Sequence, residues 1–276
     1  MRIITALQIK LSDGETARIY ARGTTNLEAY LKGWQAARYR RKGTKEDNAR
    51  ARQLFEEAIA LDPNYSGLYA GLGWAHAVDA RNGWSKSRKE SMEKALKLAQ
   101  KALALDDSRI NGGWLLAYIY RQKRQYEKSI DEAKRLIDLT PGEAIGYKML
   151  AAMLYPLGRG EETVAAAKKA IRRDPMTSAS TFYWLGMGHW VMDQYEEALE
   201  AYKKALNISP TGVYLHTVLT VTYSLLDREE EARAAAAELL RLDPDFSVDR
   251  IAKRLPFKDK AYTERYVNAL RKAGLK

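Results

Sequence analysis

Three histidines and several pairs of adjacent carboxylates are the side chains of this sequence most able to do chemistry. His76, His189 and His216 fall on apolar stripes of helical spacing, where a packed or hydrogen-bonded imidazole is commoner than a base or a ligand. No GxxxxGK phosphate loop and no HExxH zinc motif occurs, and with zero cysteines there is no thiol nucleophile and no thiolate metal site. We predict no catalytic residue, no metal site and no cofactor, and therefore no enzyme.

The carboxylate pairs have a simpler explanation than acid–base chemistry. We expect them at the starts of helices, where negative charge favours the helix dipole and faces water. These pairs are Glu56-Glu57, Glu161-Glu162, Glu196-Glu197 and Glu229-Glu230.

The composition fits a folded chain without a membrane span. Of 276 residues, 46% are hydrophobic and 29% charged, which is ordinary for a protein that buries a core. No apolar run approaches the roughly 18 residues that a spanning helix needs. The apolar stretch after Met1 is too short for a signal peptide, so the sequence predicts a cytoplasmic protein.

The net charge of +11 is concentrated at the two ends of the chain. Residues 1–45 carry +7 and residues 247–276 carry +6, which leaves −2 for the middle. A strongly basic protein is a candidate for binding nucleic acid. Because the middle is slightly acidic, and because basic runs at turns and ends usually serve solubility, we rank that partner low.

A recurring phrase shows which elements position these side chains. Its six copies end at residues 63, 107, 141, 175, 210 and 244, which are 44, 34, 34, 35 and 34 residues apart. Five of the six end in proline, and a helix usually ends before proline. The copies are Ala58-Ile-Ala-Leu-Asp-Pro63, Ala102-Leu-Ala-Leu-Asp-Asp107, Leu136-Ile-Asp-Leu-Thr-Pro141, Ala170-Ile-Arg-Arg-Asp-Pro175, Ala205-Leu-Asn-Ile-Ser-Pro210 and Leu239-Leu-Arg-Leu-Asp-Pro244.

Small residues stand upstream of each phrase, where two antiparallel helices can approach closely. They are followed four residues later by a second apolar position, so that both lie on one helix face. The pairs are Ala51 and Phe55, Ala95 and Ala99, Ser129 and Ala133, Thr163 and Ala167, Ala198 and Tyr202, and Ala232 and Ala236. Each phrase therefore closes the second helix of a helical hairpin.

These features resemble the tetratricopeptide repeat, whose period is 34 residues. The resemblance implies an all-α, right-handed α-solenoid of about six hairpins in residues 26–246, with an N-terminal helical cap or linker in residues 1–25 and C-terminal capping helices in residues 247–276. The repeats would start near Asn26, Ser66, Ile110, Ala144, Ala179 and Val213. About six extra residues within 40–47 and about ten within 81–90 would lengthen the loop or the helices of the first two hairpins.

Both ends are also similar to those of a known class of bacterial protein. Residues 4–30 and 243–275 resemble the segments that flank the tetratricopeptide tail of class III adenylate cyclase and TolB-like proteins. Because no cyclase domain is present, cyclase activity does not carry over, and the resemblance implies either a sensory or scaffold part of a larger signalling protein or a free-standing relative of it. The spacings Ser12 to Glu15 and Thr25 to Glu28 predict capping boxes at helix starts.

The resemblance also implies where a partner would bind, since the first helices of such hairpins line a concave groove. In this sequence the groove positions hold mainly aromatic residues, which are enriched at binding hot spots. They are Tyr30, Trp34, Trp74, Asn111, Trp114, Tyr118, Arg121, Lys148, Tyr155, Tyr183, Met187, Trp190, Tyr214 and Thr217. The same rings could instead be ordinary packing between hairpins.

The sequence thus predicts a protein–protein interaction scaffold whose groove binds a peptide or protein partner. The lysine and arginine positions of the family's carboxylate clamp are mostly apolar here, so a hydrophobic or aromatic peptide, with an acidic residue near Arg121 and Lys148, fits better. Two alternatives stay open: RNA or single-stranded nucleic acid bound by basic ends and stacking aromatics, and self-association into a homo-oligomer.

Overall fold

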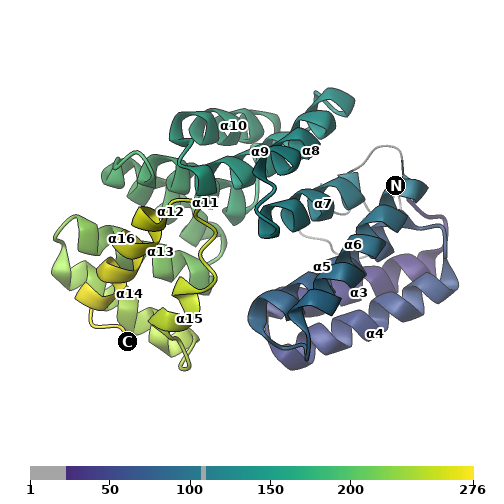
Figure 1. The fold of residues 1–276 in the computed structure, drawn as a ribbon, viewed down its shortest axis with the longest axis horizontal. Helices are drawn as coiled ribbons and strands as arrows, with labels where there is room; N and C mark the ends of the chain where they lie inside the picture. The colour runs from purple at the N-terminus through teal and green to yellow at the C-terminus, as the bar shows by residue number, and fades with distance from the viewer. Residues whose placement is uncertain (1–22, 107–109) are drawn as a thin grey trace. The chain divides into compact units, whose positions relative to one another are not determined.

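The computed structural model describes residues 23–106 and 110–276, and this part of the chain is all α-helical, with fourteen α-helices and no strand (Figure 1). The helices form successive antiparallel hairpins, which confirms the predicted fold class. The chain divides into two compact units, Met1–Pro141 and Gly142–Lys276.

Three hairpins make up the described part of the N-terminal unit. The pairs are α3 (Leu27–Lys42) with α4 (Lys45–Leu61), α5 (Ser66–Asn82) with α6 (Arg88–Leu105), and α7 (Ile110–Gln122) with α8 (Tyr126–Leu139). The extra residues of the first two hairpins lengthen their helices, which have 16 to 18 residues, against 13 and 14 in the third.

Three further hairpins and a terminal pair of helices make up the C-terminal unit. The hairpins are α9 (Ala144–Leu154) with α10 (Gly160–Arg173), α11 (Ala179–Trp190) with α12 (Tyr195–Ile208), and α13 (Val213–Leu225) with α14 (Glu229–Leu242). A 3₁₀ turn, η2 (Tyr155–Leu157), extends α9. The short α15 (Val248–Ala252) and α16 (Lys260–Lys272) follow, and α16 packs against α13 (Figure 1).

The helix boundaries follow the repeated phrase. Each second helix ends within its phrase, as proline and the residue before it require. The last helical residues are Leu61, Leu105, Leu139, Arg173, Ile208 and Leu242. Between the two helices of every hairpin, one residue has a left-handed backbone; these are Gly43, Gly83, Arg124, Gly158, Asp193 and Asp227, with φ between 58° and 81°.

The small-residue stripe forms the core of each hairpin. Every one of its twelve residues is buried, from Ala51 and Phe55 in α4 to Ala232 and Ala236 in α14. Glycine makes the closest approach possible, since a Cβ on Gly186 would lie 2.3 Å from the Tyr202 ring. A Cβ on Gly71 would meet Phe55 at the same distance.

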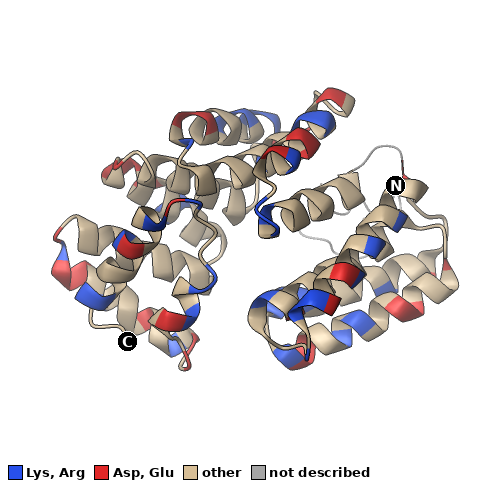
Figure 2. Ribbon diagram, in the orientation of Figure 1, with Lys and Arg blue, Asp and Glu red and all other residues tan. Residues whose placement is uncertain are grey.

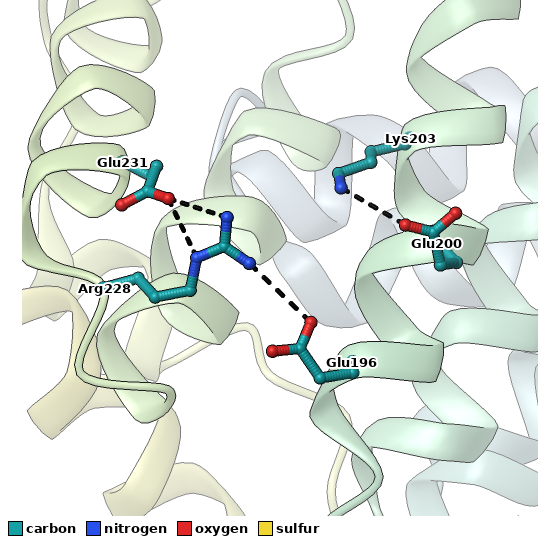
Figure 3. Close-up of polar contacts among 5 residues, drawn as sticks. All are labelled: Glu196, Glu200, Lys203, Arg228 and Glu231. Atoms are coloured by element: carbon teal, nitrogen blue, oxygen red, sulfur yellow. Dashed lines mark hydrogen bonds and ion pairs between the residues drawn. The ribbon is translucent and has the colours of Figure 1, made fainter.

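Exposed ion pairs form along and between the second helices. Arg228, just before α14, binds Glu231 at 2.7 Å and reaches Glu196 on α12 at 3.7 Å, while Lys203 pairs with Glu200 at 3.2 Å along α12 (Figure 3). Exposed pairs of this kind each contribute about 0–1 kcal/mol. These ion pairs therefore add little to the stability that the packing of neighbouring hairpins provides.

The start of the first described helix needs one correction. The N-cap of α3 is Asn26, whose side chain accepts a hydrogen bond from the Ala29 amide at 3.1 Å, and not Thr25. Thr24 supports this turn, because its hydroxyl accepts a hydrogen bond from the Asn26 amide at 3.0 Å. The predicted capping box at Ser12 and almost all of the predicted N-terminal cap lie outside the described residues.

Candidate partner-binding surfaces

The first helices of the N-terminal unit share a face that carries half-buried tryptophans. Trp34 lies on α3, Trp74 on α5 and Trp114 on α7, and each side chain keeps part of its surface in water. Helix α5 packs against both α3 and α7, so these rings belong to neighbouring helices. We call this surface, with Trp34, Trp74, Trp114 and the arginines described next, the first-helix face.

Arginines lie over the aromatic rings of this face. The guanidinium carbon of Arg38 is 4.8 Å from the centroid of Trp34, and that of Arg121 is 5.2 Å from the centroid of Tyr118. The Trp74 and Tyr118 rings meet with centroids 4.8 Å apart. Cation–π contacts at exposed sites contribute about 0.5–1 kcal/mol each. The face is therefore both aromatic and basic.

Three residues predicted for the groove hold the N-terminal unit together. Tyr30 and Tyr118 are buried, so they support the first-helix face from below. Asn111 donates hydrogen bonds from its amide to the Ser66 hydroxyl at 3.3 Å and to Asp106 at 3.5 Å. The Asn111 side chain therefore links α7 to the start of α5. Its N–H donors are used within the chain and are not offered to a partner.

In the C-terminal unit the predicted groove aromatics are covered. Trp190 is 1% exposed, and Tyr155 and Met187 are also buried. Phe257 stacks on Trp190 with ring centroids 5.7 Å apart and meets Tyr155 edge-on at 6.1 Å. These three side chains do not line an open surface in the structure, because aromatic residues of the chain's own C-terminal segment pack on this cluster.

The covering segment is held by polar contacts as well as by rings. The Lys258 amide donates a hydrogen bond to the Pro156 carbonyl at 2.8 Å. Arg265 on α16 pairs with Asp193 and lies over the Trp190 ring, 4.6 Å from its centroid. The aromatic residues of the tail, Phe257, Tyr262 and Tyr266, were a signal for this cover, yet no local pattern indicates where they pack.

Lys148, predicted to meet an acidic residue of the partner, already has one in the chain. It is 6% exposed, and its ammonium group binds the Asp174 carboxylate at 2.7 Å. Burial of the lysine without that partner would be costly. The Lys148 charge therefore serves the packing of α9 against the end of α10.

Tyr183 and Tyr214 form the exposed end of the aromatic cluster in the C-terminal unit. Tyr214 is 42% exposed and meets Tyr183 edge-on with centroids 5.3 Å apart. Desolvation raises the pKa of the Tyr183 hydroxyl well above its ordinary value, and the nearby hydroxyl of Tyr155 raises it further. Thr217 is buried and donates to the Val213 carbonyl. Only Tyr214 among the predicted residues of this unit is exposed.

Two of the three histidines form hydrogen bonds within the chain. His189 shares a hydrogen bond with Gln194 at 2.7 Å, and His216 shares one with the Pro210 carbonyl at 2.8 Å. His76 is half-buried, and desolvation, with smaller effects of Arg52 and Lys94, lowers its pKa to about 4. It is therefore neutral at pH 7.

The carboxylate pairs lie in the first turns of α10, α12 and α14, as predicted, but Glu56 and Glu57 do not. They fall near the end of α4, because that helix begins earlier, at Lys45. Glu57 binds Lys32 of α3 at 2.8 Å. This ion pair, with smaller contributions from Arg50 and Gln53, holds the pKa of Glu57 below its ordinary value.

Stacked helical hairpins with a partly exposed face on their first helices define an α-solenoid of the kind that presents surfaces to partners. Residues 114–143 and 179–211 each match the model of the tetratricopeptide repeat. The chain is an all-α solenoid that contains tetratricopeptide repeats at these two places. Among the described residues, none of the helices is both long enough and apolar enough to cross a membrane.

Three similar proteins agree with this family. The chain is 30% identical over 127 residues to "Putative adenylate cyclase 3" of Rhizobium meliloti (strain 1021), a match covering 46% of the chain and 22% of that protein. It is 29% identical over 178 residues to tetratricopeptide repeat protein 33 of Mus musculus, covering 64% and 59%. The crystal structure of a thermophilic tetratricopeptide-repeat protein of Thermus thermophilus superposes with a TM-score of 0.53 at 22% identity, covering 71% and 99%.

The two sequence relatives are longer than their matched parts. The chain spans about a fifth of the cyclase and about three fifths of the mouse protein. The tetratricopeptide fold supports a protein–protein interaction scaffold in general, because such repeats generally serve that role without catalysis.

Proposed function

We propose that this chain is a non-enzymatic scaffold that holds a peptide segment of a partner protein on the first-helix face of its N-terminal unit. The observation that carries the proposal is the contrast between the tryptophans at the predicted groove positions of the two units. Trp34, Trp74 and Trp114 remain half-buried, whereas Trp190 is packed under Phe257. Large exposed aromatic surface is uncommon on a folded protein unless it contacts something.

The kind of side chain supports peptide binding. Tryptophan and arginine are among the residues most enriched at binding hot spots, since they bring large contact area or several donors. Trp34, Trp74 and Arg121 lie on rigid helices, so little conformational entropy is lost when a ligand orders them. Arg38 adds a cation beside the rings.

The test is a selection of peptide ligands from a random library against the whole chain, followed by measurement of the dissociation constant. Replacing Trp74 with alanine should weaken the selected peptides by about tenfold or more, as expected for loss of a hot-spot ring. The matched control is Trp184→Ala, which removes another half-buried tryptophan from α11 of the other unit. Equal weakening by both substitutions would remove the support for this face, provided the melting temperatures of the two variants agree.

A second role, as the scaffold part of a signalling protein, is favoured by the match to the rhizobial cyclase. We propose that the chain or its relatives present a partner to a signalling domain. Detection of the natural gene product in cell extracts, with an antibody against this chain, tests that role. A product that carries a catalytic domain, or that co-purifies with one, supports it; a product that does neither contradicts it.

A further inference from the structure

The first helices of the two units differ in charge far more than in apolar content. Helices α3, α5 and α7 together contain seven Lys or Arg and two Asp or Glu, whereas α9, α11 and α13 contain one lysine and no carboxylate. That lysine, Lys148, is bound to Asp174. One of the two carboxylates of the N-terminal unit's first helices, Asp79, is buried and paired with Arg52 of α4. Lys32 and Lys42 pair with Glu57 and Asp47, so the positive charge of the first-helix face comes from its arginines, Arg38 and Arg81 among them.

Part of this positive charge has no counter-charge among the described residues. Among the residues that the structure describes, no carboxylate pairs with Arg38 or Arg81, and both are exposed. Arg81 lies in the last turn of α5, and Arg121 lies in the last turn of α7 (Figure 2, where α7 is tan with a blue end). Placement at helix C-termini suits the helix dipole. It also leaves the outward donors of Arg38 and Arg81 available to an anionic ligand.

The arrangement of rings and guanidinium groups favours a carboxylate over a nucleobase. Arg38 covers Trp34, Arg121 covers Tyr118, and Trp74 packs on Tyr118, so the ring faces on which a base would stack are largely occupied. A guanidinium held over a ring still presents N–H donors at its edge, and these bind carboxylates in pairs. The ring edges that stay in water suit apolar side chains or proline.

The spacing of the helices points to the shape of the ligand. Packed helices have axes about 8–10 Å apart, and α5 packs between α3 and α7. A polyproline II segment rises about 9.3 Å per three-residue turn. Such a segment crossing α3, α5 and α7 would bring every third residue to the equivalent place on the next helix. Arg38 and Arg81 lie on the neighbouring helices α3 and α5, so carboxylates about one such turn apart can reach both.

We propose that the first-helix face binds an acidic peptide in polyproline II conformation, with Asp or Glu at every third position and proline or an apolar residue between. Arg38 and Arg81 bind carboxylates, and the half-buried tryptophans Trp34 and Trp74 contact the intervening residues. About nine residues of peptide cover the three helices. This inference rests on the proposed function and adds the chemistry of the partner.

The experiment is a fluorescence-anisotropy titration of the whole chain with labelled acetyl-(Pro-Leu-Glu)₃-amide at low salt. Two probes serve as comparisons: the same peptide with glutamine for glutamate, and an oligothymidylate of about nine nucleotides, matched in residue number to the peptide. The double variant Arg38→Ala/Arg81→Ala is paired with Arg172→Ala, which removes an exposed arginine from the last turn of α10 in the other unit.

We expect the glutamate peptide to bind more tightly than the glutamine peptide. The double variant should raise its Kd by about three- to tenfold, which corresponds to two exposed charge pairs, while Arg172→Ala leaves it unchanged. Equal binding of the two peptides, or no effect of the double variant, overturns the inference. Tighter binding of the oligothymidylate that depends on the same arginines also overturns it, in favour of nucleic acid. Library-selected peptides that depend on Trp74 but not on these arginines would overturn the inference while leaving the proposed function standing.

Discussion

Replacing Phe257 with alanine removes the ring that covers the aromatic cluster of the C-terminal unit. Phe257 is 6% exposed and has ring contacts with Trp190, Tyr155, Tyr262 and Tyr266. The chain beside it is fixed by the Lys258 amide, so neighbouring residues have little freedom to fill the space. We therefore expect a cavity in place of the ring, and loss of the contact between the C-terminal segment and α11.

The expected cost follows from burial and from the lost ring contacts. Truncation of a buried phenylalanine to alanine destabilises a protein by about 3–5 kcal/mol. Aromatic pairs add about 0.5–1.5 kcal/mol beyond area, and Phe257 has four such neighbours, so we expect the upper half of that range. At a slope of about 2 kcal/mol/M, the urea midpoint falls by about 2 M.

The assay is urea unfolding followed by circular dichroism and by tryptophan fluorescence, which changes when the buried Trp190 ring becomes exposed to solvent. The control is Met176→Ala, because Met176 is 61% exposed in the same unit, and its loss should change stability by less than about 0.5 kcal/mol. A loss below about 1 kcal/mol for Phe257→Ala, well under the range for a buried ring, with unchanged fluorescence, would refute the reasoning that this segment covers the cluster.

Three further changes test the packing of the hairpins. Gly186→Ala should lower stability by about 1–3 kcal/mol in thermal or urea unfolding, because the new methyl group meets Tyr202, whereas Gly142→Ala, with nothing within 4 Å, should not. Asp79→Ala should lose about 2–3 kcal/mol in the same assay, since Asn48 and Arg52 lose a buried acceptor. His76 has a folded pKa of about 4 against 6.5 unfolded, so its contribution is complete above pH 6.5 and is lost as pH falls toward 4. A His76→Leu variant should show a flatter stability profile in that window, and an unchanged slope would contradict this.

The hairpins could be predicted because their signals are local and repeated. The proline that closes five of the six phrases ends the helix before it, and small residues four apart must share a face. The starts of α5, α7, α9, α11 and α13 coincide with the predicted repeat starts for this reason. The first two hairpins left a choice between longer loops and longer helices, and Thr44 and Ser87 decided it by capping α4 and α6.

Exposure of the groove residues could not be predicted in the same way. Trp74 and Trp190 both stand on first helices, but one is half-buried and the other lies under Phe257, which is far away in the sequence. Lys148 likewise looked like a partner contact because its acceptor, Asp174, lies outside its own helix. Burial depends on what packs above a residue, and helical periodicity carries no information about that.

Two arginines of the first-helix face, Arg38 and Arg81, are visible in the sequence but lie outside the family's groove positions. The predicted groove residue of α5 is Trp74, well before the last helical turn of this long helix, where Arg81 lies. Arg38 follows Trp34 by four residues, the spacing that brings two side chains together on a helix. The i, i+4 spacing from Trp34 is therefore the signal in the sequence that could have identified Arg38.

Hydrogen–deuterium exchange of the whole chain, with and without a library-selected peptide at saturation, tests the central claim most directly. If the first-helix face holds the partner, backbone amides of α3, α5 and α7 exchange more slowly in the complex, and those of α9, α11 and α13 do not change. Protection confined to the first helices of the C-terminal unit, or no protection at all at saturation, would contradict the account.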